Sequence, residues 1–263
     1  MIEVPELPRR NALVDLGRGF LLPFQSLRLL FATPALRSLT LIIAAITFLS
    51  LGAVIAALWH FNPAIVGLVW QRPDTWYLAA LHTLFSAAVF LLLTVLGANI
   101  LPLTLAAPLM DPLSASAERA MGITLVSEGG LKRLASEIAR QVGHALVRIC
   151  VLLLGHLVLL LLFLIPGAGA VVWTWAGWAW TVLWLAAQYL DVPMARHLYS
   201  FDEELALLRR RTALCFGFGA AIYLLLWVPL LNFLFVPVAV VAGTTLFRAM
   251  VRAKEILPPR DER

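Results

Sequence analysis

Two long, mainly apolar runs, residues 34–59 and 76–109, constrain the fold more than any other feature of this 263-residue chain. A transmembrane helix needs about 20 consecutive apolar residues, and both runs reach that length. Pro34 opens the first run, and proline is favoured at the first position of a helix. The second run is longer than a bilayer requires, and Pro102 and Pro108 predict a kink where it leaves the membrane. We therefore expect two long transmembrane helices.

The composition places the chain among membrane proteins. Hydrophobic residues make up 62% of it and charged residues only 13%, whereas soluble domains carry about 25% charged residues. The mean hydropathy of +0.91 implies that lipid solvates many apolar side chains. Residues 1–20 contain three acidic residues and two prolines without an apolar core, so we expect no cleaved signal peptide. The predicted fold class is an all-α, polytopic integral membrane protein with a single membrane domain over residues 1–263.

Two segments predict amphipathic helices outside the bilayer. Residues 9–31 mix arginines with leucines and phenylalanines at helical spacing, which indicates an interfacial helix interrupted near Pro23. Residues 111–140 are the most polar interior stretch. Asp111 is expected to cap a short helix there, with Pro112 at its first position and a second helix following.

Two further apolar pairs predict helical hairpins with proline at their tips. The first covers residues 142–190 and turns at residues 166–169, and the second covers residues 213–247 and turns at residues 229–232. The arms of the second hairpin have only about 15 residues each, close to the lower limit for a span. This hairpin therefore either crosses the membrane or enters and leaves it on one side.

The basic residues predict an orientation. Except for Arg72, every lysine and arginine falls on one side of this topology, including those of an expected solvated helix at residues 193–212 and a tail at residues 248–263. The positive-inside rule places this side, with both termini, in the cytoplasm. Tryptophans gather near the opposite tips, as an aromatic belt does. The positive charge thus reflects topology and attraction to anionic lipids, and we expect no nucleic-acid partner.

A family resemblance is carried by five stretches that occur in a fixed order. They are Ser26-Leu27-Arg28 with Pro34; residues 105–114 with Glu118; residues 164–169; residues 186–193 with Arg196, Phe201 and Arg211, leading to residues 217–219; and residues 228–232, through Pro237, to residues 242–245. Their order and spacing resemble the CysZ sulfate permeases and the wider etoposide-induced-protein-like superfamily, over about residues 14–250.

This resemblance implies a protein of the cell inner membrane that admits sulfate for cysteine synthesis. It also implies two long spanning helices, hairpins that penetrate the membrane only partly, and a homo-oligomer. Sulfate lies in that family near a Gly-Leu-Arg motif at the end of the first amphipathic helix, and the matching residues here are Ser26, Leu27 and Arg28. Serine replaces glycine at this point. Its hydroxyl can donate to an oxyanion, whereas glycine would permit a closer approach of the backbone.

Arg28 and Arg37 are the candidate anion-binding side chains. A dianion requires cationic donors or the exposed N–H groups of a helix start. Arg28 lies at the end of the amphipathic helix and Arg37 in the first turn of the first span. The alternative is that both arginines anchor the protein at the interface by contacting lipid phosphate.

Four other charged residues form a candidate pore or gating network: Asp111, Glu118, Arg148 and Asp191. Arg148 lies within an apolar segment, where a charge costs at least about 2.5–3.5 kcal/mol and should face a partner. The three acidic residues could each pair with it. Alternatively, they cap helices and Arg148 extends to the nearby cytoplasmic interface.

No motif predicts an enzyme or a site for a metal or cofactor, since HExxH, GxSxG and Walker sequences are missing. Without an ATP site, transport would be passive or coupled to an ion gradient. The leading hypothesis is a permease or channel for sulfate or a related oxyanion. The alternative is a non-transporting scaffold or assembly factor that binds a partner or anionic lipid through its basic cytoplasmic helices.

Overall fold

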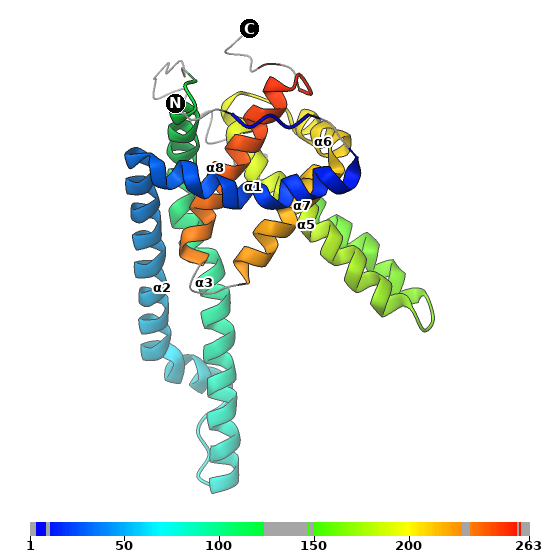
Figure 1. Ribbon diagram of the computed structural model, residues 1–263. Helices are drawn as coiled ribbons and strands as arrows, with labels where there is room; N and C mark the ends of the chain where they lie inside the picture. The colour runs from blue at the N-terminus through cyan, green and yellow to red at the C-terminus, as the bar shows by residue number, and fades with distance from the viewer. Residues whose placement is uncertain are drawn as a thin grey trace. The chain divides into compact units, whose positions relative to one another are not determined.

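The computed structural model describes residues 4–8, 11–123, 147, 150–227, 232–256 and 258, and the regular elements among them are helical. In chain order they are α1 (Ala12–Ala32), α2 (Pro34–Val69), α3 (Trp76–Ala120), the 3-10 helix η1 (Leu161–Leu164), α5 (Gly169–Arg196), α6 (Phe201–Arg210), α7 (Thr212–Leu226) and α8 (Asn232–Arg252) (Figure 1). Residues 150–160 are also α-helical. The predicted all-α class is confirmed.

Four helical segments are long and apolar enough to cross a membrane. They are Pro34–Val69, Trp76–Gly97, Gly169–Arg196 and Phe235–Arg252. Two shorter apolar helices, Cys150–Leu164 and Thr212–Leu226, belong to the predicted hairpins. The polytopic architecture expected from the apolar runs is therefore present.

Both long helices extend further than predicted. Residues 60–69, expected in a loop, continue α2 through Pro63. The amide of Asn62 donates to the Ser86 hydroxyl at 2.7 Å and so ties this end of α2 to α3. The predicted short helix capped by Asp111 does not exist, because α3 continues without a break to Ala120.

The prolines near the end of α3 do not end the helix. The reason is that they lie on its exposed face. Pro108 and Pro112 are both exposed, whereas Leu113 and Ala117 on another face of the helix are buried. A proline inside a helix costs about 3 kcal/mol. The packing of the buried face offsets this cost.

The amphipathic helix α1 begins at an N-cap, where the side chain of Asn11 accepts a hydrogen bond from the Val14 N–H at 3.1 Å. The predicted interruption does not occur, because Pro23 lies inside α1 on its buried face. The helix ends at Thr33, which is extended, since the residue before a proline is disfavoured in the helical conformation. Pro34 then starts α2, as predicted.

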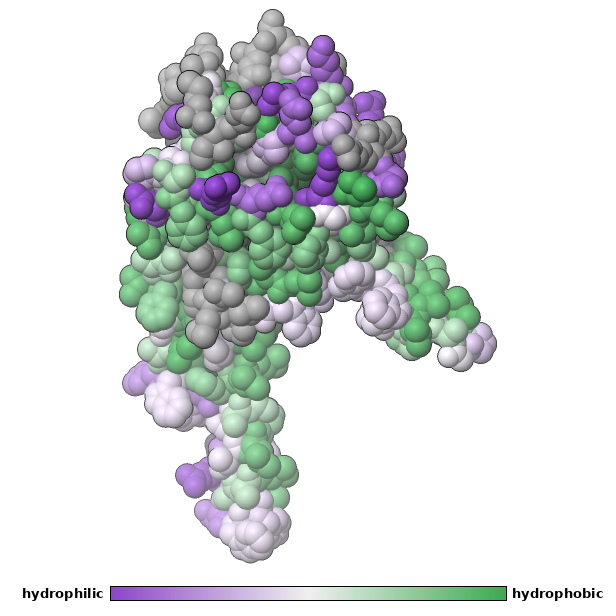
Figure 2. Space-filling model, viewed as in Figure 1, coloured by the Kyte–Doolittle hydropathy of each residue, from purple (hydrophilic) through white to green (hydrophobic). Residues whose placement is uncertain are grey.

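The described chain forms two compact units, residues 39–109 and the remainder. In the larger unit α1 lies across α7 and α8 (Figure 1). The helices α1 and α7 approach closely because both contribute glycine: a Cβ atom at Gly217 would clash with the Leu16 carbonyl, and one at Gly19 with the Leu214 carbonyl. Figure 2 shows hydrophilic residues along α1 and around α6, whereas the arm of η1 and α5 is mainly hydrophobic.

The N-terminal strap, which we define as residues 4–8, is bound to this unit mainly through its backbone, and also through the Glu6 carboxylate, which accepts from Arg252 at 3.0 Å. The carbonyl of Val4 accepts a hydrogen bond from Arg252 at 2.8 Å, and that of Pro8 accepts one from Arg18 at 3.0 Å. Between them, the carbonyl of buried Leu7 accepts from the Arg211 guanidinium at 3.3 Å. Arginines of three different helical regions thus hold this segment in place.

The smaller unit is a pair of apolar helices formed by most of α2 and α3. The ring of Trp59 contacts that of Phe90, and Nε2 of His82 lies 3.2 Å from the Trp70 carbonyl. No residue of the Trp76–Gly97 span is buried within the described structure. An apolar helix with this degree of exposure is typical of a segment that faces lipid.

Candidate functional site

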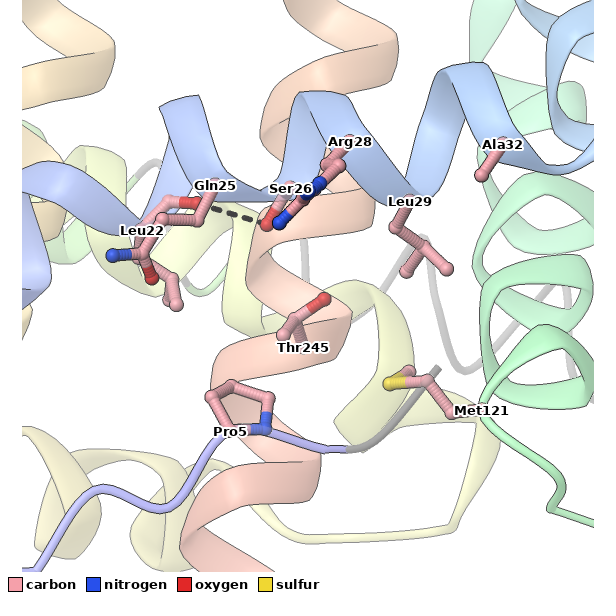
Figure 3. Close-up of a pocket in the computed structure, with 9 residues that line it drawn as sticks. All are labelled: Pro5, Leu22, Gln25, Ser26, Arg28, Leu29, Ala32, Met121 and Thr245. Atoms are coloured by element: carbon pink, nitrogen blue, oxygen red, sulfur yellow. Dashed lines mark hydrogen bonds between the residues drawn. The ribbon is translucent and has the colours of Figure 1, made fainter. Parts of the chain in front are cut away.

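A pocket of about 380 Å³ lies against the C-terminal half of α1, within the larger unit (Figure 3). Most of its wall comes from α1, and the strap, the turn after α3 and α8 complete it. The lining residues are Pro5, Leu22, Gln25, Ser26, Arg28, Leu29, Ala32, Met121 and Thr245. Two residues of the predicted anion motif, Ser26 and Arg28, are therefore at this pocket.

Arg28 is the cationic group of the pocket. Its side chain is exposed, and it forms no ion pair or hydrogen bond with another side chain in the described segments. A guanidinium carries five N–H donors in a planar fork that fits oxyanions. Arg28 can therefore bind an anion without first breaking an ion pair with any of the described residues.

The hydroxyl groups of the pocket are already used. Ser26 is buried and its hydroxyl donates to the Leu22 carbonyl at 2.9 Å, as Figure 3 shows. The Thr245 hydroxyl likewise donates to the Val241 carbonyl at 2.8 Å. A hydroxyl has one hydrogen to donate, so neither residue has a free donor for an oxyanion in this arrangement.

The other two residues of the predicted anion site do not line the pocket. Leu27 is partly exposed on α1. Arg37 is exposed in the first turn of α2, where its backbone N–H donates to the Thr33 carbonyl. Like Arg28, Arg37 forms no ion pair within the described residues.

A second cluster of charges centres on Glu118, near the end of α3. This carboxylate is fully buried and lies 2.7 Å from Nε of Arg248, 2.8 Å from Nη1 of Arg196 and 3.0 Å from Nε2 of His197. Arg196 also contacts the half-exposed carboxylate of Asp111 at 2.8 Å. The cluster joins α3, α5 and α8 through charge-assisted hydrogen bonds.

The environment of Glu118 favours its ionised form. Burial by itself would raise the pKa of this carboxyl group, since desolvation disfavours a charge. The hydrogen bond with His197 and the positive charge of Arg248 outweigh this effect, so the pKa lies below its ordinary value. Glu118 is consequently a fixed negative charge at neutral pH.

His197 has two competing partners. Its Nε2 lies 3.0 Å from the Glu118 carboxylate and 2.9 Å from Nη2 of Arg248. A protonated Nε2 donates to the carboxylate, whereas a bare Nε2 accepts from the guanidinium, and it cannot do both at once. The ring also stacks on Phe247 at 5.6 Å between centroids, which fixes its plane.

The predicted gating residues lie in different surroundings in the structure. Asp111 and Glu118 are brought together through Arg196. Asp191 lies inside α5 and does not close it, because the helix continues to Arg196. Arg148, the expected partner of Glu118, lies outside the described residues.

A third cluster surrounds Arg211, between α6 and α7. This arginine was expected in a solvated basic helix, but it is only 3% exposed. It lies 3.4 Å from the Asp15 carboxylate of α1 and forms an ion pair with Glu255 beyond α8. The expected helix at residues 193–212 is in fact divided, because α6 begins at a capping box formed by Ser200 and Glu203.

Arg248 and His197 are members of a charged cluster that the sequence patterns do not indicate. Arg248 is expected only as one of the basic residues of the cytoplasmic tail, and no pattern singles out His197. One signal was present: Ser114, Ala117 and Glu118 are spaced at i, i+3 and i+4 and fall on one helical face, where the small side chains indicate close packing around a carboxylate that needs cations. Within the described segments, no group of three His, Cys, Asp or Glu side chains is placed to hold a metal ion.

These helices and buried charge clusters define a multi-pass helical membrane protein. Residues 22–237 match the family model described as sulfate transporter CysZ/etoposide-induced protein 2.4. The chain belongs to this family, and the predicted resemblance is confirmed.

Several curated relatives are named sulfate transporter CysZ. The chain is 38% identical to the protein of Pseudomonas paraeruginosa over 118 residues, which cover 43% of this chain and 46% of the relative. It is 31% identical to that of Pectobacterium atrosepticum over 180 residues (68% and 63%) and 25% identical to that of Vibrio parahaemolyticus over 206 residues (75% and 81%). The match to the Pseudomonas relatives thus spans less than half of their length.

Proposed function

We propose that this protein is a sulfate transporter of the cell inner membrane that supplies sulfate for cysteine synthesis. The family match over residues 22–237 and the names of the relatives support this proposal. No Walker sequence occurs in the chain, so transport is passive or coupled to an ion gradient. We also propose a homo-oligomer, as the family resemblance implies.

The observation that carries the proposed anion site is the state of Arg28. The guanidinium groups of Arg196, Arg211 and Arg248 each contact at least one carboxylate. Arg28 contacts none in the described residues and lines a pocket of which seven of the nine lining residues fall in the family-matched region. An oxyanion supplies the missing counter-charge, with Arg37 as a second cation for anions arriving at the start of α2.

The proposed orientation places both termini in the cytoplasm. The tip between α2 and α3 carries Arg72 as its one basic residue, and the turn at residues 166–169 carries none. The strap and the end of α8 contain or bind several arginines and so belong to the opposite, cytoplasmic side. Accessibility of engineered cysteines at residues 167 and 258 to a membrane-impermeant reagent tests this orientation.

Sulfate uptake into proteoliposomes tests the function and the site together. We compare the wild type with Arg28→Gln, which removes the charge but keeps most of the side-chain length. A lost charge-assisted hydrogen bond weakens binding by about 10- to 100-fold, so uptake at low sulfate should fall by a similar factor. Arg209→Gln is the matched control, because Arg209 is exposed on α6 and does not line the pocket.

Each outcome has a separate meaning. Uptake that is lost in Arg28→Gln and kept in Arg209→Gln supports the site. Equal uptake in all three proteins refutes the site while retaining the transporter. Folded wild-type protein that admits no sulfate refutes transport and favours the scaffold alternative, for which Arg209 and Arg210 are the basic residues to neutralise, since Arg211 is buried.

A further inference from the structure

The pocket at Arg28 is larger and more apolar than a small oxyanion requires. Its volume of about 380 Å³ equals the space of roughly a dozen water molecules. Five of its nine lining side chains are apolar: Pro5, Leu22, Leu29, Ala32 and Met121. A hydrated dianion gains nothing from such a wall, whereas a hydrocarbon chain is stabilised by contact with it.

The charged and the apolar side chains are separated within this pocket. Leu22, Leu29 and Met121 are buried in its wall, together with Ser26 and Thr245, whose hydroxyls already donate to backbone carbonyls. Gln25 and Arg28 are exposed at its rim. They lie three residues apart and therefore on neighbouring positions of the same helical face. The pocket thus combines a cationic rim with an apolar interior.

The placement of α1 fits this division. It is an amphipathic helix that presents exposed apolar residues such as Leu21, Phe24 and Phe31 on one side. Helices of this kind lie in the membrane interface, at the level where phosphate head groups meet acyl chains. A cation there attracts anionic lipids.

We infer that this pocket is a binding site for an anionic phospholipid. The phosphate is held by the guanidinium of Arg28 and the amide of Gln25, and part of an acyl chain lies against Leu22, Leu29 and Met121. The lipid phosphate and sulfate compete for the same guanidinium, but this inference does not depend on transport, because it needs only the charge and the apolar wall of one pocket.

Native mass spectrometry of the purified full chain in detergent tests the site. The probes are phosphatidylglycerol, phosphatidylcholine with the same acyl chains, and glycerol phosphate, which has the charged head without chains. We expect the wild type to bind phosphatidylglycerol at least about tenfold more tightly than either of the other two. Arg28→Gln should abolish the preference for phosphatidylglycerol.

A pocket-filling variant separates the contribution of the acyl chain to lipid binding from that of the charge. Ala32→Trp adds bulk at an exposed position on the pocket wall and leaves Arg28 in place. It should weaken phosphatidylglycerol about tenfold and leave binding of sulfate or glycerol phosphate unchanged. Ala32→Ser, which keeps the volume, and Arg209→Gln, which removes an exposed cation outside the pocket, should both behave as the wild type. Melting temperatures establish that each variant is folded.

Three results would overturn the inference. The first is equal affinity of the wild type for phosphatidylglycerol and phosphatidylcholine. The second is glycerol phosphate binding as tightly as the lipid, which would make the site one for a small anion only. The third is an equal loss of lipid in Arg209→Gln and Arg28→Gln, which would indicate general attraction to basic residues. Sulfate uptake by the wild type is measured separately, so the lipid site and the transport function can fail independently.

Discussion

Glu118→Gln removes the carboxylate shared by Arg248, Arg196 and His197 while preserving the size of the side chain. The carboxylate is fully buried and Arg248 is only 4% exposed, so their contact at 2.7 Å is largely shielded from water. Breaking a buried ion pair by removing one partner costs about 3–5 kcal/mol. Arg196 adds little to this cost, because it keeps its contact with Asp111.

This cost can be measured as a shift in the midpoint of thermal unfolding. A change of 1 kcal/mol moves the midpoint by roughly 2–4 °C in a chain of similar length, so Glu118→Gln should lower it by roughly 6–20 °C. The assay is intrinsic fluorescence of the protein in detergent, at one heating rate for every variant because unfolding of membrane proteins is often irreversible.

Asp111→Asn is the matched control. It makes the same change from carboxylate to amide, and Asp111 contacts the same guanidinium of Arg196 at 2.8 Å. Its side chain is 49% exposed, however, and exposed ion pairs contribute only about 0–1 kcal/mol. We expect a shift of a few degrees at most. Equal shifts in the two variants would refute the argument that burial makes the Glu118 cluster important.

Two further predictions concern packing and pH. Gly217→Ala should destabilise the protein by about 1–3 kcal/mol, because its Cβ atom would clash with a backbone carbonyl of α1. Gly177→Ala is the control, since a Cβ atom there meets open space and the variant should be neutral or slightly stabilising. Thermal unfolding compares the two variants, and equal effects would contradict the close approach of α1 and α7. The lowered pKa of Glu118 means that its contribution to stability is fully present above its ordinary value of 4.5 and is lost as the pH falls through the lower folded value. The unfolding midpoint of the wild type should therefore change more steeply with pH below 4.5 than that of Glu118→Gln, and parallel curves would count against this assignment.

The sequence was sufficient to predict the helices, because their signals are local. Apolar runs of membrane length, Pro34 at a helix start and the amphipathic spacing of α1 each require only neighbouring residues. The start of α5 at Gly169, after the turn that contains Gly167 at a φ of 77°, likewise follows from a local Pro-Gly pattern. The structure has the bounds of α1 and the starts of α2, α3 and α5 close to their predicted positions, whereas α2 and α3 end further along the chain.

The sequence could not predict the helix bounds at positions where local helix propensity and tertiary packing disagree. Asp111 followed by Pro112 is a typical helix start, but the buried face formed by Leu113 and Ala117 carries α3 past it. Pro63 in α2 is tolerated in the same way, next to the bond between Asn62 and α3. Local residue preferences contain no information about such distant contacts.

The charged clusters were harder to predict than the helix bounds, because their members are far apart in the chain. Glu118 and Arg248 are separated by 130 residues. The sequence alone indicates Glu118 and Arg28 as candidate site residues, but it does not show which arginines have carboxylate partners. That distinction, which separates Arg28 from Arg248, required coordinates.

The strap suggests how this part of the protein can change in evolution. The carbonyl groups of Val4, Leu7 and Pro8 accept hydrogen bonds from Arg252, Arg211 and Arg18, and the Glu6 carboxylate also accepts one from Arg252 at 3.0 Å. Every amino acid presents the same carbonyl, so Val4 and Pro8 can be exchanged with little loss provided that the length of the segment stays constant, whereas Glu6 and buried Leu7 also use their side chains. Relatives should therefore keep the length of this segment more faithfully than its amino-acid identities.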